Sequence, residues 1–180
     1  MLIDAGRSQL LVIDFQEKML PALADGATLL AHCCWVIAAA QKIGVPVAAT
    51  EQYPKGLGPL VPEIRELLQP EAIAEKARFS AVAAQCLANL PGSDRAQVIV
   101  IGVEAHVCVL QTAIDLYHEG KEVFLVADCV GSRAATDRDL AIARMRQEGV
   151  RIVSREMVVF EWLGEAGTAL FRAVNKAFLK

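Results

Sequence analysis

Residues 102–115 read G-V-E-A-H-V-C-V-L-Q-T-A-I-D and join two elements of different periodicity. The run before them, residues 97–101 (Q-V-I-V-I), is apolar and β-branched, which is typical of a buried strand in a parallel sheet. From Val107 onward, apolar residues recur at helical spacing, and Gly120 is a usual helix terminator. The stretch therefore predicts a strand that turns directly into a helix, with Cys108 in the first helical turn.

The position of Cys108 admits two interpretations. Free backbone N–H groups and the positive end of the helix dipole lie at a helix N-terminus, where they stabilise a thiolate and lower its pKa. Most free cysteines, however, are small buried apolar residues with no reactive role. This stretch alone leaves both a reactive and a structural Cys108 open.

The rest of the chain alternates strands with helices. Five further strands are predicted at residues 10–13, 45–50, 72–76, 122–127 and 150–154. Helices are predicted at residues 27–43, 62–68, 80–90, 136–149 and 165–178, with a short helical turn at 156–162. The alternation predicts a single domain, residues 1–180, with a three-layer α/β/α architecture and a largely parallel six-stranded sheet. Ligands of such sheets bind beyond the carboxyl ends of the strands.

Composition and charge narrow the classes of function. The chain has 180 residues, 54% of them hydrophobic, and a net charge of -3, with no basic stripe that would follow a nucleic acid. No apolar run reaches the ~20 residues that span a bilayer, and the N-terminus lacks the layout of a signal peptide. We therefore expect a cytoplasmic protein that binds neither nucleic acid nor membrane. The apolar surplus favours a homo-oligomer.

Cysteine usage and glycine motifs exclude several kinds of site. The cysteines are Cys33, Cys34, Cys86, Cys108 and Cys129. Their number is odd and no C-x-x-C spacing occurs, so neither a disulfide framework nor a structural zinc site is expected. The sequence contains neither G-x-G-x-x-G nor G-x-x-x-x-G-K-[ST], so no dinucleotide or P-loop site is indicated.

Three chemically distinct side chains fall at the carboxyl ends of predicted strands: Asp14, Lys76 and Cys108. Because these ends meet at one edge of a parallel sheet, we expect the three to converge. A carboxylate can accept the proton of a thiol during attack, and an ammonium stabilises both charged partners. Each residue also has a structural alternative, as a helix cap, a surface lysine and a core thiol respectively.

The chain resembles the isochorismatase-like hydrolases, in the branch that uses a catalytic cysteine. The matching motifs, in the family's order, are L-L-V-I-D-F-Q, T-E-Q-Y-P-K-G-L-G, E-K-A-R-F-S, G-V-E-A-H-V-C-V and D-C-V-G-S-R. They span nearly the whole chain. The second and fourth are most similar to the isochorismatase-domain-containing subgroup.

This resemblance implies a Rossmann-like α/β fold and assigns the catalytic triad to Asp14, Lys76 and Cys108. It implies a cis peptide bond between Val103 and Glu104. The backbone N–H groups of Glu104 and Cys108 would then form an oxyanion hole. It also implies that neither a metal nor an organic cofactor is required.

Two departures from other branches restrict the activity. Nicotinamidases of the family carry a metal-binding D-x-H after the second strand, where this chain has Glu51-Gln52-Tyr53. Metal-dependent nicotinamidase activity is therefore not expected. Authentic isochorismatases have a residue other than cysteine at position 108, so Cys108 argues against vinyl-ether cleavage of isochorismate.

Secondary candidates for the substrate pocket are Gln16, Tyr53, Phe79 and His106. Structural roles are the alternatives for Gln16, whose amide can bond the backbone, and for His106, which can be a packed, hydrogen-bonded residue. Glu104 beside the nucleophile must pair with an arginine or lysine that the sequence does not identify. We expect Asp128 and Arg133 to hold the loop after the fifth strand.

The sequence thus predicts a cysteine-dependent hydrolase of a small molecule, cleaving an amide C–N bond through a thioester. One alternative is a binding or scaffold protein that keeps the fold without catalysis, because a fold does not determine a function. Another is a redox-sensing thiol, with Cys129 approaching Cys108 in space.

Overall fold

A computed structural model gives the structure of residues 1–179 and contains one six-stranded sheet. Its strands are β1 (Ser8–Ile13), β2 (Val47–Gln52), β3 (Ile73–Lys76), β4 (Gln97–Val103), β5 (Glu122–Gly131) and β6 (Arg151–Val153). Neighbouring strands are all parallel, in the order β3-β2-β1-β4-β5-β6. The predicted α/β class with a parallel sheet is confirmed.

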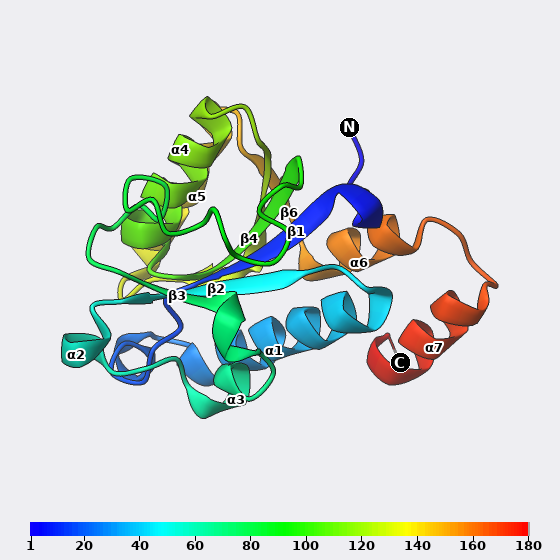
Figure 1. Cartoon of the computed structure of the whole chain (residues 1–180), viewed down its shortest axis with the longest axis horizontal. Helices are drawn as coiled ribbons and strands as arrows, with labels where there is room; N and C mark the ends of the chain where they lie inside the picture. The colour runs from blue at the N-terminus through cyan, green and yellow to red at the C-terminus, as the bar shows by residue number, and fades with distance from the viewer. Residues whose placement is uncertain (180) are drawn as a thin grey trace.

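Helices cover both faces of this sheet (Figure 1). They are α1 (Gly26–Ile43), α2 (Pro54–Leu57), α3 (Pro62–Arg65), α4 (Leu110–His118), α5 (Ala135–Gln147), α6 (Arg155–Leu163) and α7 (Ala169–Phe178). The side chains of β1 alternate between two cores: Leu10 and Val12 pack with α1 and α6, whereas Leu11 and Ile13 pack with α4 and α5. This alternation explains why the strands read as continuous apolar runs.

Helix α1 is long and apolar enough, by length and composition, to cross a membrane. It buries Cys33, Val36 and Ile37 in the core beneath the sheet. Helix α1 also packs against α7, where Trp35 meets Phe178 edge to face with ring centroids 6.0 Å apart. These contacts are those of the core helix of a globular domain.

The strand order reverses between β1 and β4, which are adjacent although two strands separate them along the chain. Such a switch point opens a crevice beyond the carboxyl ends of the two strands. Gly102 permits their close approach there, because its φ is +127° and a Cβ at this position would lie 2.1 Å from the Ile13 carbonyl oxygen. The fold therefore brings the residues after β1 and β4 together.

Residues 80–90 form turns, so the helix predicted there is wrong. Tertiary hydrogen bonds replace helical ones: Ser80 Oγ donates to Asp115 Oδ2 at 2.6 Å, and the Ala81 N–H donates to Thr112 Oγ1 at 3.0 Å. Gln85 has a φ of +55°, which a helix does not allow.

Several boundaries also differ from those predicted. Strand β5 extends to Gly131, and α7 begins at Ala169. The segment containing Cys108, Ala105–Val109, is a wide π-type turn that precedes α4. Cys108 therefore lies ahead of the regular α-helix. Short π-type turns of this kind occur frequently at functional sites.

Candidate active site

Asp14 and Lys76 form a buried ion pair at the carboxyl edge of the sheet. Asp14 follows β1, and Lys76 is the last residue of β3. Lys76 Nζ donates to Asp14 Oδ2 at 2.7 Å, and neither side chain is exposed to solvent. Thr50 Oγ1 donates to the other carboxylate oxygen, Asp14 Oδ1, at 2.7 Å. Two of the three side chains expected to converge are thus in direct contact.

Cys108 lies next to this pair, and its thiol is nearly buried. The pKa of Cys108 is raised from 9.0 to about 12, chiefly by burial and then by the Asp14 carboxylate, while the Lys76 ammonium opposes the shift. The lowered pKa implied by one of the two interpretations of Cys108 is therefore not found, because desolvation of the thiolate outweighs the favourable charges. Cys108 is a neutral thiol at pH 7 and needs a proton acceptor before it can attack.

A cavity of about 330 Å³ opens onto Cys108. Its apolar lining comes from Met19, Leu57, Phe79 and Val107. Its polar lining comes from Lys18, Gln52, Glu104 and Arg133. A cavity with apolar walls and several charged and polar side chains beside a thiol with a shifted pKa has the properties of a small-molecule site.

Of the four pocket candidates, only Phe79 contributes to this lining among the described residues. Gln16 is fully buried, and its Nε2 donates to the carbonyls of Gln52 (2.9 Å) and Gly58 (2.6 Å). Tyr53 is 58% exposed. The remaining candidate, His106, has its Nδ1 2.9 Å from Ser132 Oγ, beside the start of α5.

The sequence of residues 8–157 matches the Isochorismatase domain family. This chain belongs to that family. Isochorismatase domain-containing protein 2 of Danio rerio is 38% identical over 171 residues, covering 94% of this chain and 85% of that protein. The predicted family membership is confirmed.

Two solved structures extend this likeness to the whole fold. The MAR1 ribonuclease of Caenorhabditis elegans superposes with a TM-score of 0.89 at 35% identity, covering 100% of this chain and 93% of that one. YcaC from Pseudomonas aeruginosa, solved with hexane-2,5-diol and covalent acrylamide, superposes with a TM-score of 0.83 at 26% identity, covering 99% of this chain and 92% of that one.

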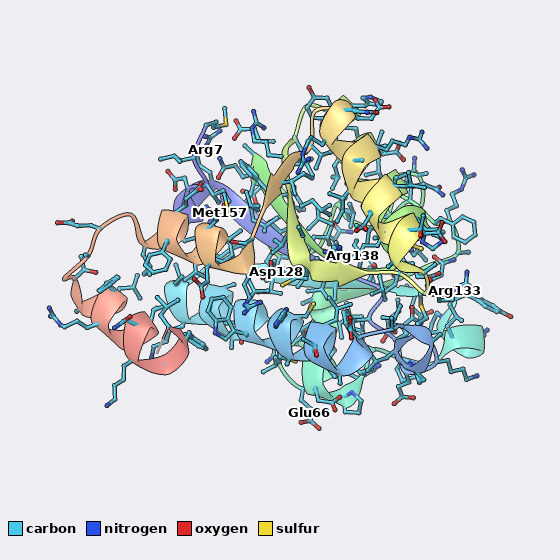
Figure 2. All side chains as sticks on the ribbon, turned by 180° about the vertical axis from the view of Figure 1, so that it is seen from behind. Arg7, Glu66, Asp128, Arg133, Arg138 and Met157 are labelled. Carbon is cyan, nitrogen blue, oxygen red and sulfur yellow. The ribbon has the colours of Figure 1, made fainter. Side chains whose placement is uncertain are left out.

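Arg133 is the partner of Glu104 that the isochorismatase-like sequence did not reveal. Arg133 Nε and the Arg133 backbone N–H both donate to Glu104 Oε1, at 2.9 and 3.1 Å. The peptide bond between Val103 and Glu104 is cis. Asp128, which we expected to hold the same loop as Arg133, forms an ion pair with Arg155 at 2.7 Å. Figure 2 shows Arg133 at the edge of the molecule near α2, well apart from Asp128.

Cys129 does not approach Cys108. It packs in the core beneath α1, where Cys33 Sγ lies 3.4 Å from the Cys129 carbonyl oxygen, whereas Cys108 belongs to the core on the α4 face. The sheet therefore separates the two thiols, and the redox pairing considered from sequence is wrong. Within residues 1–179, no three His, Cys, Asp or Glu side chains cluster as metal ligands.

Two hydrogen-bonding residues of the site were missed from sequence: Thr50 and Gln52. Both lie at the end of β2, between β1 and β3, and they are two residues apart. Residues at this spacing point to the same face of a strand. The polar T-x-Q pattern that ends an apolar strand was therefore a signal that could have identified them.

Proposed function

We propose that this isochorismatase-family protein is a cysteine-dependent hydrolase that cleaves the C–N bond of a small amide. The observation that carries the proposal is the buried Asp14–Lys76 pair beside a thiol that opens onto a cavity. These groups meet at the switch point of the sheet, where ligands of such folds bind. The family membership supports a hydrolase in general terms.

Acylation begins with transfer of the Cys108 proton to Asp14. With a pKa of about 12 the thiol carries its proton at neutral pH, so an adjacent base is needed. The sulfur attacks the amide carbonyl carbon, and the N–H groups of Glu104 and Cys108 donate to the resulting oxyanion. Asp14 then gives the proton to the leaving nitrogen as the C–N bond breaks, which leaves a thioester and a free amine or ammonia.

Deacylation reuses the same base. Asp14 takes a proton from water, the hydroxide attacks the thioester carbonyl, and the C–S bond breaks. The carboxylic acid leaves, and the proton on Asp14 returns to the sulfur of Cys108. Throughout, the Lys76 ammonium holds the carboxylate in place and stabilises the transient thiolate.

The covalent acrylamide in the P. aeruginosa relative supports a reactive nucleophile in proteins of this fold. Acrylamide combines an amide with an electrophilic double bond, to which a thiol adds at the terminal carbon. In this protein we expect Cys108 to be the residue that takes acrylamide. Such an adduct would place an amide group inside the cavity that Phe79 and Val107 line.

The test is a screen of small amides for ammonia release, with intact-mass detection of an acyl-enzyme. Active substrates should show a transient adduct on Cys108, and Cys108→Ala should fold but lose turnover. Cys34→Ala is the matched control, because Cys34 is a half-buried thiol on α1. Full turnover by Cys108→Ala would overturn the proposal. Binding of amides by the wild type without cleavage of any of them would overturn it in favour of a catalytically silent binding protein.

RNA cleavage is a second candidate, because the C. elegans relative is named a ribonuclease. The net charge of -3 disfavours it, since binding to phosphate backbones depends on basic side chains. A short RNA belongs in the same screen. Its cleavage by the wild type, with loss of cleavage in Cys108→Ala, would replace the amide as the substrate class.

A further inference from the structure

We propose that Gln52 is a positioning residue of this site, whose side-chain amide holds the Lys76 ammonium against Asp14. This deepens the proposed function and rests on it, because positioning matters to catalysis only if the Asp14–Lys76–Cys108 group is catalytic. Gln52 ends β2 and lies opposite Lys76 in the β2–β3 register. It is nearly buried and contributes to the lining of the Cys108 cavity.

Both ends of the Gln52 amide are engaged, so its orientation is determined. Oε1 accepts from Lys76 Nζ at 2.7 Å, and Nε2 donates to the Ala77 carbonyl at 2.7 Å. A flipped amide would place its own N–H groups against the ammonium and an oxygen against a carbonyl oxygen. The amide therefore forms hydrogen bonds both with the lysine side chain and with the backbone carbonyl of the next residue.

The lysine has three N–H donors. The Arg78 carbonyl lies 3.4 Å from Lys76 Nζ, and three acceptors are closer. They are Asp14 Oδ2 at 2.7 Å, Gln52 Oε1 at 2.7 Å and the Phe79 carbonyl at 3.0 Å. Only Asp14 carries a charge. A neutral acceptor at position 52 directs the ammonium without neutralising it, so its field still acts on Asp14 and Cys108.

A second buried amide fixes Gln52 itself. The Gln52 N–H donates to Gln16 Oε1 at 2.7 Å, and Gln16 Nε2 donates back to the Gln52 carbonyl at 2.9 Å. Gln16 Nε2 also donates to the Gly58 carbonyl at 2.6 Å, which ties the loop after β2 to the same point. Gln16 thus positions Gln52, and Gln52 positions Lys76.

The test measures the rate at which iodoacetamide alkylates Cys108 as a function of pH, by peptide mass spectrometry. Gln52→Glu places a carboxylate against Lys76 and near the thiol. The added carboxylate should raise the pKa of the Cys108 thiol, and each unit of that rise lowers the thiolate population tenfold. We therefore expect about tenfold slower labelling at pH 8 and a profile displaced to higher pH. Gln52→Met removes the acceptor and retains the size, and should slow labelling about threefold or more at this pH.

The matched control is Gln41→Met, which removes an exposed amide on α1 that donates to the Leu67 carbonyl. Its profile should match the wild type. Folding of each variant is checked by its thermal midpoint. Gln52→Asn, which keeps the amide but shortens the side chain, is the second variant if Gln52→Met does not fold, and it should slow labelling in the same direction.

A Lys76→Met background separates positioning from general packing. There the Gln52→Met change should have no further effect, because its target is gone. Superimposable profiles for the wild type, Gln52→Glu and Gln52→Met would overturn the proposal. An undiminished effect of Gln52→Met in the Lys76→Met background would do the same. Alkylation requires no turnover, so this result is independent of whether any amide proves to be a substrate.

Discussion

Two buried thiols on opposite faces of the sheet differ in what surrounds them. Burial raises the pKa of both Cys108 and Cys33, so neither stands out by its acidity. Cys33 on α1 has Cys129 as its principal neighbour and bonds a backbone carbonyl. Cys108 has a carboxylate, an ammonium and a cavity beside it. A proton acceptor and room for a substrate distinguish the candidate nucleophile, whereas thiol pKa does not.

The difference follows from where the chain places each residue. Cys33 lies within α1, packed under the middle of the sheet by apolar side chains such as Val36 and Ile37. Cys108 lies just beyond β4 at the switch point, where strands end and polar side chains can converge. The same residue type is thus packed among apolar side chains on one face and lies beside charged groups and a cavity at the edge.

The largest effect is expected when each thiol is removed in turn. Cys108→Ser should lower turnover of an amide substrate by about 1,000-fold or more, since serine retains the size but is a far weaker nucleophile. Cys33→Ser should leave turnover within about twofold, because it contacts no group of the site. Steady-state kinetics measures both variants, and equal losses would contradict the distinction.

The next largest effect concerns the charges that only one thiol has. Lys76→Met leaves the buried Asp14 carboxylate without its partner, so the free energy of unfolding should fall by about 3–5 kcal/mol. The control is Arg7→Met, which breaks a pair with Glu122 whose side chains are 47% and 21% exposed. That change should cost less than about 1 kcal/mol. Urea denaturation compares the two, and similar losses would mean that the buried pair is not a special feature.

Much of this fold could be predicted from sequence because its signals are local. Apolar runs such as residues 97–101 identify buried strands, and glycines such as Gly44 and Gly120 mark helix ends. The segment 80–90 could not be predicted, because its conformation depends on bonds from Ser80 and Ala81 to α4, which is distant in sequence. Local propensity is overridden there by tertiary contacts.

The site was predictable only to the extent that strand ends identify it. Asp14 and Lys76 were found because each ends a predicted strand, and the structure shows them in contact. The pairing of Glu104 with Arg133 was not predictable, since 29 residues separate them. The direction of the Cys108 pKa was also missed, because it depends on a balance between burial and two charges that only coordinates provide.

Thr50→Val tests a smaller part of the same network. Thr50 Oγ1 donates to Asp14 Oδ1 in the core, and valine keeps the shape but removes the donor. Because hydrogen bonds to charged groups contribute more than neutral ones, stability should fall by about 1.5–3 kcal/mol. Ser93→Ala, which removes an exposed bond to the Ala88 carbonyl, is the control and should cost less. An equal loss in both variants would argue against a stabilising role for Thr50.

The pH dependence of Cys108 labelling distinguishes the acidity of the thiol from its role in turnover. With a pKa of about 12, the native thiolate population and the rate of iodoacetamide labelling should rise about tenfold per pH unit between pH 7 and 10.

The Asp14 charge contributes to raising that pKa, so Asp14→Asn should move the labelling profile to lower pH and accelerate labelling at pH 8. The same variant should lose amide turnover, because the proton acceptor is gone. Cys33 should stay unlabelled until the protein unfolds, since it is fully buried. If labelling and turnover both fell in Asp14→Asn, the carboxylate would promote thiolate formation in the resting protein. That result would contradict the view that burial sets the thiol pKa and that Asp14 removes the proton only during attack.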